Sequence, residues 1–193
     1  MYELPTTVQI GETILTVRNR GDYRTVLDCF RALEDVELTK TERIIASLII
    51  FYEDLNSLED VNNLPDIELA YAEMVRFFNC GRESVGAHSN YKVIDWDKDE
   101  TLICSAINNV AQTEIRALPY LHWWTFMGYY LSIGECSLST IVSIRTKRAK
   151  GQKLEKHEQK FVRDNPEYFW SMQTVEQQEL DAEIRRMWNS GGA

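Results

Sequence analysis

The segment from Tyr120 to Ile133 constrains the fold more than any other part of this chain. It follows Pro119, a residue that suits the first turn of a helix, and it is apolar or aromatic on nearly every helical face. A helix that is apolar all round is normally buried in a core or against a partner. Gly134 then ends it, and Ser137 or Ser139 is expected to cap a second helix. The pattern predicts a helical hairpin whose first arm is a core helix.

The rest of the chain predicts a mainly α protein of six to eight helices with a short N-terminal β-hairpin. Alternating β-branched residues flank Gly11 and Glu12, a plausible two-residue hairpin turn. Helical periodicity and capping signals place helices at 22–33, 41–55, 65–81, 97–117 and near 154, with a final one over 169–187. We expect a single compact domain over residues 1–193, with the hairpin in 1–20, a helical core in 22–150 and a basic, then amphipathic, helical extension in 151–193.

Bulk composition excludes several classes of protein. The net charge of −9 argues against a chain that binds nucleic acid over its whole surface, because such domains are basic. Four scattered cysteines without a CxxC pair indicate reduced thiols rather than a disulfide framework. The first residues lack a basic and an apolar region, so no signal peptide is expected, and no apolar run reaches the ~20 residues that span a bilayer. The simplest expectation is a soluble, cytoplasmic protein without a membrane partner.

An acidic cluster, Asp95-x-Asp97-x-Asp99, imitates the start of an EF-hand calcium loop. That loop needs Gly at its sixth position and a bidentate Glu at its twelfth, where this chain has Glu100 and Ala106. The pattern therefore favours a solvated, helix-capping cluster over a calcium site. We expect no metal here.

The residues that carry enzyme chemistry are not arranged in any known catalytic spacing. His88, His122 and His157 are far apart in sequence and form no zinc-binding pattern. His122 stands next to two tryptophans, which favours a packed, hydrogen-bonded histidine over a catalytic one. Neither GxSxG, a Walker loop nor GxGxxG is present. We predict no enzyme activity, no catalytic residues and no cofactor.

The segment from Arg145 to Arg163 is strongly basic. Its eight Lys and Arg against Glu155 and Glu158 give a net charge of +6, which leaves −15 for the rest of a chain whose total is −9. Such a segment could contact several phosphates of a nucleic acid. It lacks a recognisable DNA-binding module, so a solvated helix face, or a patch that pairs with the acidic bulk of another copy, is favoured.

Five large rings crowd eight residues near the start of the central segment. They are Trp123, Trp124, Phe126, Tyr129 and Tyr130. Together they span every direction of a helix, so one pair could face outward, and exposed aromatic residues are typical interface anchors. Two readings stay open: a purely structural core, or a core with an interface.

The sequence resembles the bacteriophage Gp15 family of tailed phages that infect Gram-positive bacteria. The resemblance is carried by YLHWWTFMGYY and the following STIVSIRTKRAKGQKLEKHEQKF, by IDWDKDE before them, and by the opening VQIGETILTV and DYRTVLDCF. It covers most of the chain and is weakest over residues 56–87. Consecutive tryptophans are rare, which makes LHWW with a basic run behind it fairly specific. The motif is not catalytic, so it transfers no active-site residues.

The resemblance implies a tail assembly chaperone for long, non-contractile tails. Such a protein coats the tape measure protein, keeps it soluble in the host cytoplasm, and leaves as the tail tube polymerises, so it is absent from the mature virion. An acidic body with a basic face also suggests self-association into rings or open polymers. The alternatives are a nucleic-acid-associated phage protein that uses residues 145–163, and a structural component of the tail or neck.

The predicted partner-binding residues belong to the aromatic and basic clusters. The aromatic anchors are the outward-facing members of a set of four, and three basic residues are expected to steer contact or self-assembly. The set is Trp123, Trp124, Tyr129, Tyr130, Arg145, Lys147 and Arg148.

Overall fold

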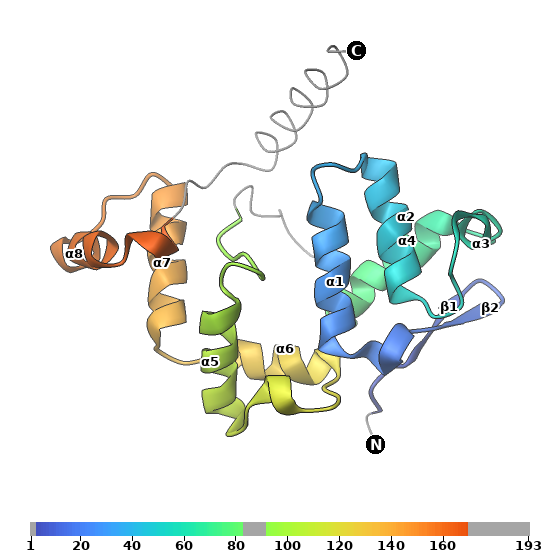
Figure 1. Cartoon of the computed structure of the whole chain (residues 1–193), viewed down its shortest axis with the longest axis horizontal. Coiled ribbons are helices and arrows are strands. Elements are labelled where there is room, and N and C mark those ends of the chain that lie inside the picture. The colour runs from blue at the N-terminus through green and yellow to red at the C-terminus, as the bar shows by residue number, and fades with distance from the viewer. Residues whose placement is uncertain (1–2, 83–91, 170–193) are drawn as a thin grey trace, which may run out of the picture. The chain divides into compact units, whose positions relative to one another are not determined.

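The computed structural model describes residues 3–82 and 92–169, and these form a mainly α protein (Figure 1). Eight α-helices and one two-stranded antiparallel hairpin lie within them, which confirms the predicted fold class. The elements are β1 (Thr7–Ile10), β2 (Thr13–Thr16), α1 (Tyr23–Glu34), α2 (Lys40–Phe51), α3 (Leu58–Asn62), α4 (Ile67–Phe78), α5 (Glu100–Ala111), α6 (Trp123–Leu131), α7 (Ser137–Ala149) and α8 (Lys156–Asp164). Among the described helices, none combines the length and apolar character that a bilayer crossing requires.

The contacts of the chain gather into two compact units. The N-terminal unit comprises Met1–Gly86 and Leu118–Gly128, and the C-terminal unit comprises Ala87–Ala117 and Tyr129–Ala193. The N-terminal unit is therefore discontinuous in sequence, and α6 begins in it and ends in the other. The expectation of one domain over residues 1–193 stays a prediction.

The N-terminal hairpin has the predicted turn. β1 and β2 pair antiparallel with Thr7 opposite Thr16 and Ile10 opposite Thr13, which leaves Gly11 and Glu12 as a two-residue connection. Gly11 has a φ of +60°, a conformation that glycine adopts without steric cost.

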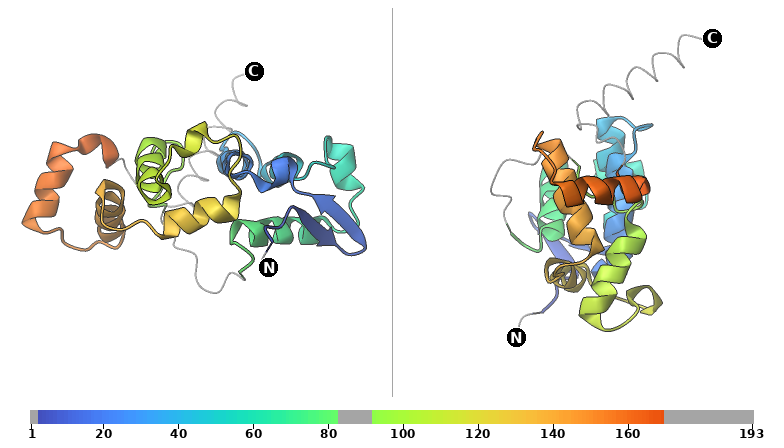
Figure 2. Two further views of the ribbon diagram at one scale, coloured as in Figure 1. Left: turned by 90° about the horizontal axis from the view of Figure 1, so that it is seen from below. Right: turned by 90° about the vertical axis from the view of Figure 1, so that its left-hand side faces the viewer.

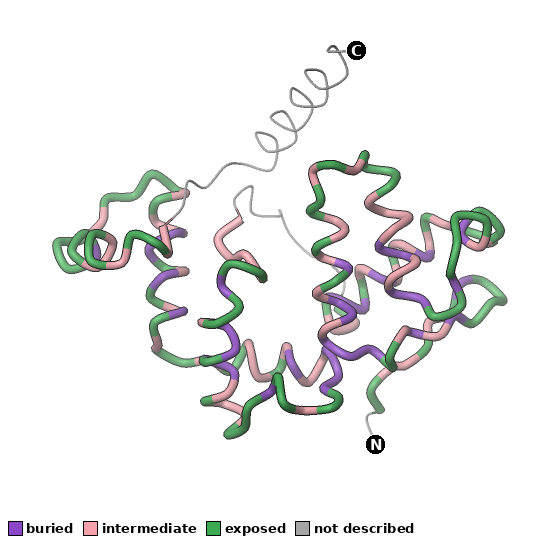
Figure 3. The backbone as a smooth tube through the Cα atoms, in the orientation of Figure 1, coloured by how far each residue is buried: buried purple, intermediate pink, exposed green. Residues whose placement is uncertain are grey.

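Helices α1 and α2 lie side by side and form the centre of the N-terminal unit (Figures 1 and 2). Asp22 caps α1 by accepting a hydrogen bond from the backbone N–H of Arg24. The predicted capping box begins α2, since Thr39 and Glu42 each accept a hydrogen bond from the other's backbone N–H. The buried side chains on these helices include Val26, Cys29, Leu48 and Phe51, and buried positions recur along both (Figure 3).

The next two helices differ from expectation. No helix was predicted between 41–55 and 65–81, yet α3 forms there because Ser57 caps it and Val61 is buried beneath it. Helix α4 begins after Asp66, whose side chain accepts from the N–H of Leu69. The left-handed position after the helix is taken by Cys80, with a φ of +56°, and the predicted closing residue Gly81 follows it with a φ of +77°, its N–H donating to the Arg76 carbonyl at 2.9 Å.

The C-terminal unit contains α5, α7 and α8. Helix α5 is shorter than predicted, because Gln112 takes a left-handed conformation and ends it. Helix α7 begins after Cys136, whose backbone N–H donates to the Ser139 hydroxyl, so neither predicted serine is the capping position itself. Helix α7 packs against α5 rather than forming the expected hairpin with α6. Helix α8 begins at Lys156, close to the helix that the sequence predicted near residue 154.

The central aromatic helix, α6, is shorter than the predicted span of residues 120–133. Tyr120, Leu121 and His122 lie outside the helix, because the chain here is hydrogen-bonded to the start of α1. The Leu121 N–H donates to the Asp22 carboxylate at 2.9 Å, and the Leu121 carbonyl accepts from the Tyr23 N–H at 2.9 Å. The final helix predicted over 169–187 lies outside the described residues, apart from its first position.

Candidate functional site

Both tryptophans of the central motif bind the end of α4. The Trp123 indole N–H donates to the Phe78 carbonyl and the Trp124 indole N–H to the Phe77 carbonyl, each at 2.9 Å. The last carbonyls of a helix have no partner inside it, so Trp123 satisfies the Phe78 carbonyl, while Trp124 adds a second donor to the Phe77 carbonyl, which also accepts from the Cys80 N–H at 3.0 Å. Trp123 is only 1% exposed and stacks on Phe126, whereas Trp124 is half-buried. The pair is first of all a structural clamp.

His122 fixes the backbone at Trp124 and makes hydrogen bonds through both of its ring nitrogens. Its Nδ1 accepts the backbone N–H of Trp124 at 3.0 Å, so its Nε2 must carry the proton that it shares with the Pro5 carbonyl, also at 3.0 Å. Burial lowers the pKa of His122, which keeps this neutral tautomer. A packed, hydrogen-bonded histidine is what the sequence predicted.

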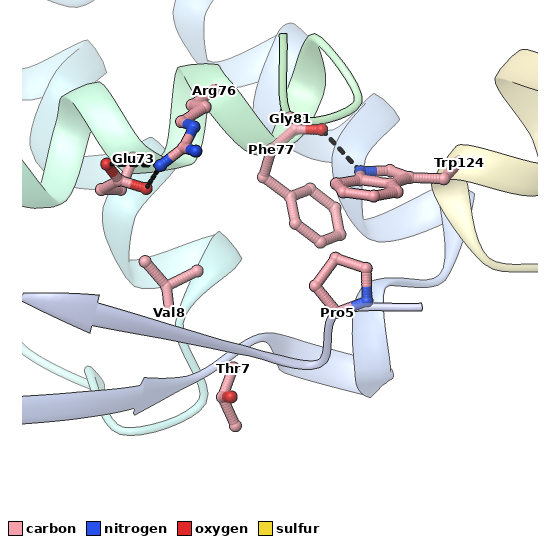
Figure 4. A pocket seen from close by; sticks show the side chains of 8 residues that line it. All are labelled: Pro5, Thr7, Val8, Glu73, Arg76, Phe77, Gly81 and Trp124. Atoms are coloured by element: carbon pink, nitrogen blue, oxygen red, sulfur yellow. Dashed lines mark hydrogen bonds and ion pairs between the residues drawn. The ribbon is translucent and has the colours of Figure 1, made fainter. Parts of the chain in front are cut away.

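A small pocket opens beside the exposed part of Trp124 (Figure 4). Its volume is about 210 Å³, and the rings of Pro5, Phe77 and Trp124 form its apolar wall together with Val8. The figure shows these rings gathered at one end, with the Glu73–Arg76 ion pair at the other. All the lining residues belong to the N-terminal unit. The pocket has room for one apolar side chain, not for a cofactor.

A second, larger cleft lies in the C-terminal unit. Its volume is about 370 Å³, and it is walled by the end of α6, the residues after it, and the first half of α7. The lining side chains are Tyr130, Leu131, Ile133, Leu138, Ser139, Val142 and Ser143. No charged side chain lines it, and Leu131 is 64% exposed at its edge. Tyr130 rests on Trp96, and burial raises the pKa of its hydroxyl.

The first basic residue of the predicted surface, Arg145, is buried. Its guanidinium makes a two-pronged ion pair with Asp99 at 2.6 and 2.9 Å. Its remaining donors reach the Val93 carbonyl at 3.1 Å and the Tyr168 carbonyl at 2.7 and 3.0 Å, so all five N–H groups have a partner. Because 1% of the Arg145 side chain and 0% of the Asp99 side chain are exposed, this ion pair is a buried structural contact of the C-terminal unit.

The rest of the basic segment is more accessible. Lys147 is paired with Glu158 at 2.6 Å, and this hydrogen bond raises the pKa of the lysine and lowers the pKa of the glutamate. Six further basic side chains are exposed and have no acidic partner within the described part of the chain. They are Arg148, Lys150, Lys153, Lys156, Lys160 and Arg163. The last three follow one face of α8 at intervals of four and three residues.

Burial thus divides the predicted partner-binding residues. Trp123 and Arg145 are inaccessible in this conformation, while Trp124, Tyr129, Tyr130, Lys147 and Arg148 retain accessible surface. Their partner role stays a prediction. Trp124 lines the pocket of the N-terminal unit, and Tyr130 lines the cleft of the C-terminal unit.

Sequence reasoning missed the apolar side chains that surround Tyr130. The sequence placed Leu131 and Ile133 in a core helix, yet Leu131, at the end of α6, is 64% exposed. Sequence reasoning also missed Asp99 as the partner of Arg145. The described residues contain no group of three His, Cys, Asp or Glu side chains that could hold a metal ion. In the acidic cluster, Asp95 is paired instead with Lys92 and Lys98.

The family model described as "Bacteriophage Gp15 protein" matches residues 2–169. The chain belongs to this family. It is therefore a phage protein, and the match includes both units and the tryptophan clamp. Neither a curated protein nor a solved structure shows a significant match to the chain.

Proposed function

We propose that this Gp15-family protein is a non-enzymatic tail assembly chaperone that transiently binds the tape measure protein. In this role it keeps the tape measure soluble in the host cytoplasm, hands it to the polymerising tail tube, and is absent from the mature virion. Membership of the family supports the phage context. The single structural observation that carries the proposal is the open apolar cleft between the end of α6 and α7.

The cleft suits an apolar helical stripe. Its walls are aliphatic and aromatic, and its only polar side-chain groups besides the Tyr130 hydroxyl are those of Ser139 and Ser143. An amphipathic helix that lays its apolar face into such a groove is a common mode of recognition. A long tape measure must expose many stripes of this kind before the tail tube covers it.

Weak binding at each site is consistent with a partner that must later leave. The apolar wall is small, so a single cleft buries only a few side chains of a helix. Many copies along one elongated chain would raise the overall strength without new contacts, and the growing tube could displace them one at a time. The exposed basic residues at the end of α7 and on α8 would attract acidic residues beside the apolar stripe.

The test is co-expression with the tape measure protein of the same genome, followed by size-exclusion chromatography with light scattering. We expect a soluble complex that contains many copies of this chain. Leu131→Asp places a charge at the edge of the cleft and should return the tape measure to the insoluble fraction. The matched control is Leu58→Asp, because Leu58 is similarly exposed, at 53%, but lies on α3. If both variants behave like wild type, the cleft is not the binding site.

A second candidate function follows from the exposed basic side chains of α7 and α8. They could contact the phosphates of a nucleic acid, although Arg145 and Lys147, which contributed to the +6 charge, are already paired with carboxylates. Six phosphate contacts would give a plot of log affinity against log salt with a slope of about −5 on duplex DNA. A titration of DNA at low and moderate salt separates the two functions.

A structural role in the tail or neck is the remaining alternative. Mass spectrometry of purified virions distinguishes it, since a chaperone should be missing from them and a structural component present in fixed copy number.

A further inference from the structure

The outer edge of β1 carries backbone groups that the fold leaves unpaired. The Val17 N–H donates to the Thr6 carbonyl at 2.9 Å, so Thr6 and Val17 form a hydrogen-bonded pair of the hairpin ladder. Hydrogen-bonded and non-hydrogen-bonded pairs alternate along antiparallel strands. Val8 therefore bonds to β2, while Thr7 and Gln9 direct their N–H and carbonyl groups away from it.

The two edges of the hairpin differ at Thr16 but not at Ile14, whose outward backbone groups likewise have no partner within the described residues. On β2, the Thr16 N–H donates to the Asp54 carboxylate at 2.6 Å and the Thr16 carbonyl accepts from the Glu53 N–H at 2.9 Å. On β1, the outward backbone groups of Thr7 and Gln9 have no partner within residues 3–82 and 92–169, and both residues are exposed. Edge strands are usually guarded by a charge, a proline or a bulge. The strand TVQI has none of these over its length.

The open stretch is short and sharply bounded. Before it, the Pro5 carbonyl, which points to the same edge, accepts from His122 at 3.0 Å. After it, the chain enters the turn at Gly11 and Glu12. The unpaired edge thus extends from Thr7 to Gln9, three of the four residues of β1, and is too short to reward a long guest strand.

We propose that this edge pairs with the same edge of a second copy of the chain, so that two hairpins join into one four-stranded antiparallel sheet about a two-fold axis. The inference concerns self-association and does not depend on the chaperone function. It also differs from charge-driven association between acidic and basic surfaces, because backbone groups of identical segments meet.

One register satisfies every open group. With Val8 opposite Val8 of the second copy, Thr7 lies opposite Gln9 of the second copy, and the reverse holds by symmetry. Both residues of each such pair carry outward N–H and carbonyl groups, so each pair exchanges two hydrogen bonds. No acidic residue then faces another within the paired strands, since β1, with the sequence TVQI, contains none.

The pocket beside Trp124 is lined by Thr7 and Val8, which belong to the strand that would pair with the second copy. Side chains of directly opposed residues point to the same face of a sheet and lie in contact. Val8 lines the pocket with Pro5, Phe77 and Trp124, whereas no residue of β2 does. The side chain opposite Val8, which is Val8 of the second copy, would therefore enter the space beside this apolar wall.

Charge predicts an unusual salt dependence for this dimer. The N-terminal unit contains sixteen acidic and eight basic residues, so two copies of it repel each other. Screening weakens that repulsion, with a Debye length of about 10 Å at 0.1 M salt. Pairing through β1 should strengthen as salt is added, whereas association between acidic and basic patches should weaken.

The experiment is a dilution series of the ¹⁵N-labelled full-length chain, from tens of micromolar to about 1 mM, at low and high salt. We expect the amide signals of Thr7 and Gln9 to shift with concentration and to gain protection from hydrogen exchange, more so at high salt. Signals that do not change with concentration would overturn the proposal and leave the edge to another protein. Changes confined to α7 and α8 and reversed by salt would also overturn it.

Two proline variants provide a matched pair. Gln9→Pro removes an outward N–H without touching the bonds between β1 and β2, and it should weaken association at least about tenfold. Ile14→Pro makes the same change on the opposite edge, since Ile14 is paired with Gln9 and is 65% exposed, and should leave association unchanged. Thr7→Pro repeats the test if Gln9→Pro disturbs the fold. Equal effects of the two edges would refute the assignment.

Discussion

The ion pair between Arg145 and Asp99 gives the sharpest test of how the C-terminal unit is held together. The change is Asp99→Ala, which leaves the guanidinium buried with 1% of the arginine side chain exposed and no counter-charge. Removing one partner of a buried pair costs about 3–5 kcal/mol, because the remaining charge is desolvated without compensation. Asp99 makes no side-chain capping bond to α5, so lost helix capping does not account for the effect.

The magnitude translates into a measurable shift of the midpoint of thermal unfolding. For a chain of 150–250 residues, 1 kcal/mol corresponds to about 2–4 °C, so a loss of 3 kcal/mol lowers the Tm by about 6–12 °C. Circular dichroism during heating, with urea unfolding as a second measure, is the assay. The control is Asp28→Ala, which breaks a surface pair with Arg31 whose side chains are 55% and 54% exposed. It should cost at most about 1 kcal/mol.

The double variant Asp99→Leu with Arg145→Met distinguishes charge burial from lost packing. Well-packed apolar residues often replace a buried ion pair without loss of stability. We therefore expect the double variant to be more stable than Asp99→Ala alone. If Asp99→Ala unfolds like the Asp28→Ala control, the reasoning about a buried, fully bonded guanidinium is refuted.

Two further predictions concern the N-terminal unit. Gly21→Ala should destabilise it by about 2–4 kcal/mol in urea unfolding, since Gly21 has a φ of +76° and an added Cβ would lie 2.7 Å from the Phe77 ring. Gly128→Ala, where nothing lies within 4 Å, should instead stabilise by about 0.5–1 kcal/mol. The lowered pKa of His122 means that the unfolded chain takes up its proton first, so stability should fall as the pH drops below 6.5. His122→Gln should flatten this pH dependence, whereas His157→Gln, at a side chain 77% exposed, should not.

The sequence predicted those elements whose signals are local. The capping box at Thr39, the hairpin turn at Gly11 and the glycine after α4 each fix the backbone within a few residues. The non-helical start of the central segment could not be predicted in this way. Its geometry depends on Asp22, about a hundred residues earlier, whose carboxylate both caps α1 and binds the Leu121 N–H. No periodicity carries that information.

The candidate site shows the same limit. The basic run was visible in the sequence, but Arg145 is buried against Asp99, the residue before α5, and the spacing of residues could not predict that this ion pair neutralises the arginine. The sequence also could not say which aromatic residues face outward. Trp123 and Trp124 are adjacent, yet Trp123 is enclosed and Trp124 lines a pocket. Their indole N–H groups donate to different carbonyls at the end of α4.

The discontinuous N-terminal unit has a consequence for the order in which the protein is made. Its first stretch ends at Gly86, but the tryptophan clamp that binds the end of α4 comes from Leu118–Gly128. During synthesis, the ribosome must therefore produce all of α5 and the following loop before the first unit is closed. Until then, the carbonyls of Phe77 and Phe78 lack their indole donors, and the apolar surface around them is not yet covered by Trp123. A chain released or cleaved before residue 128 would present an unfinished core, so the N-terminal unit can be completed only after part of the C-terminal unit has been translated.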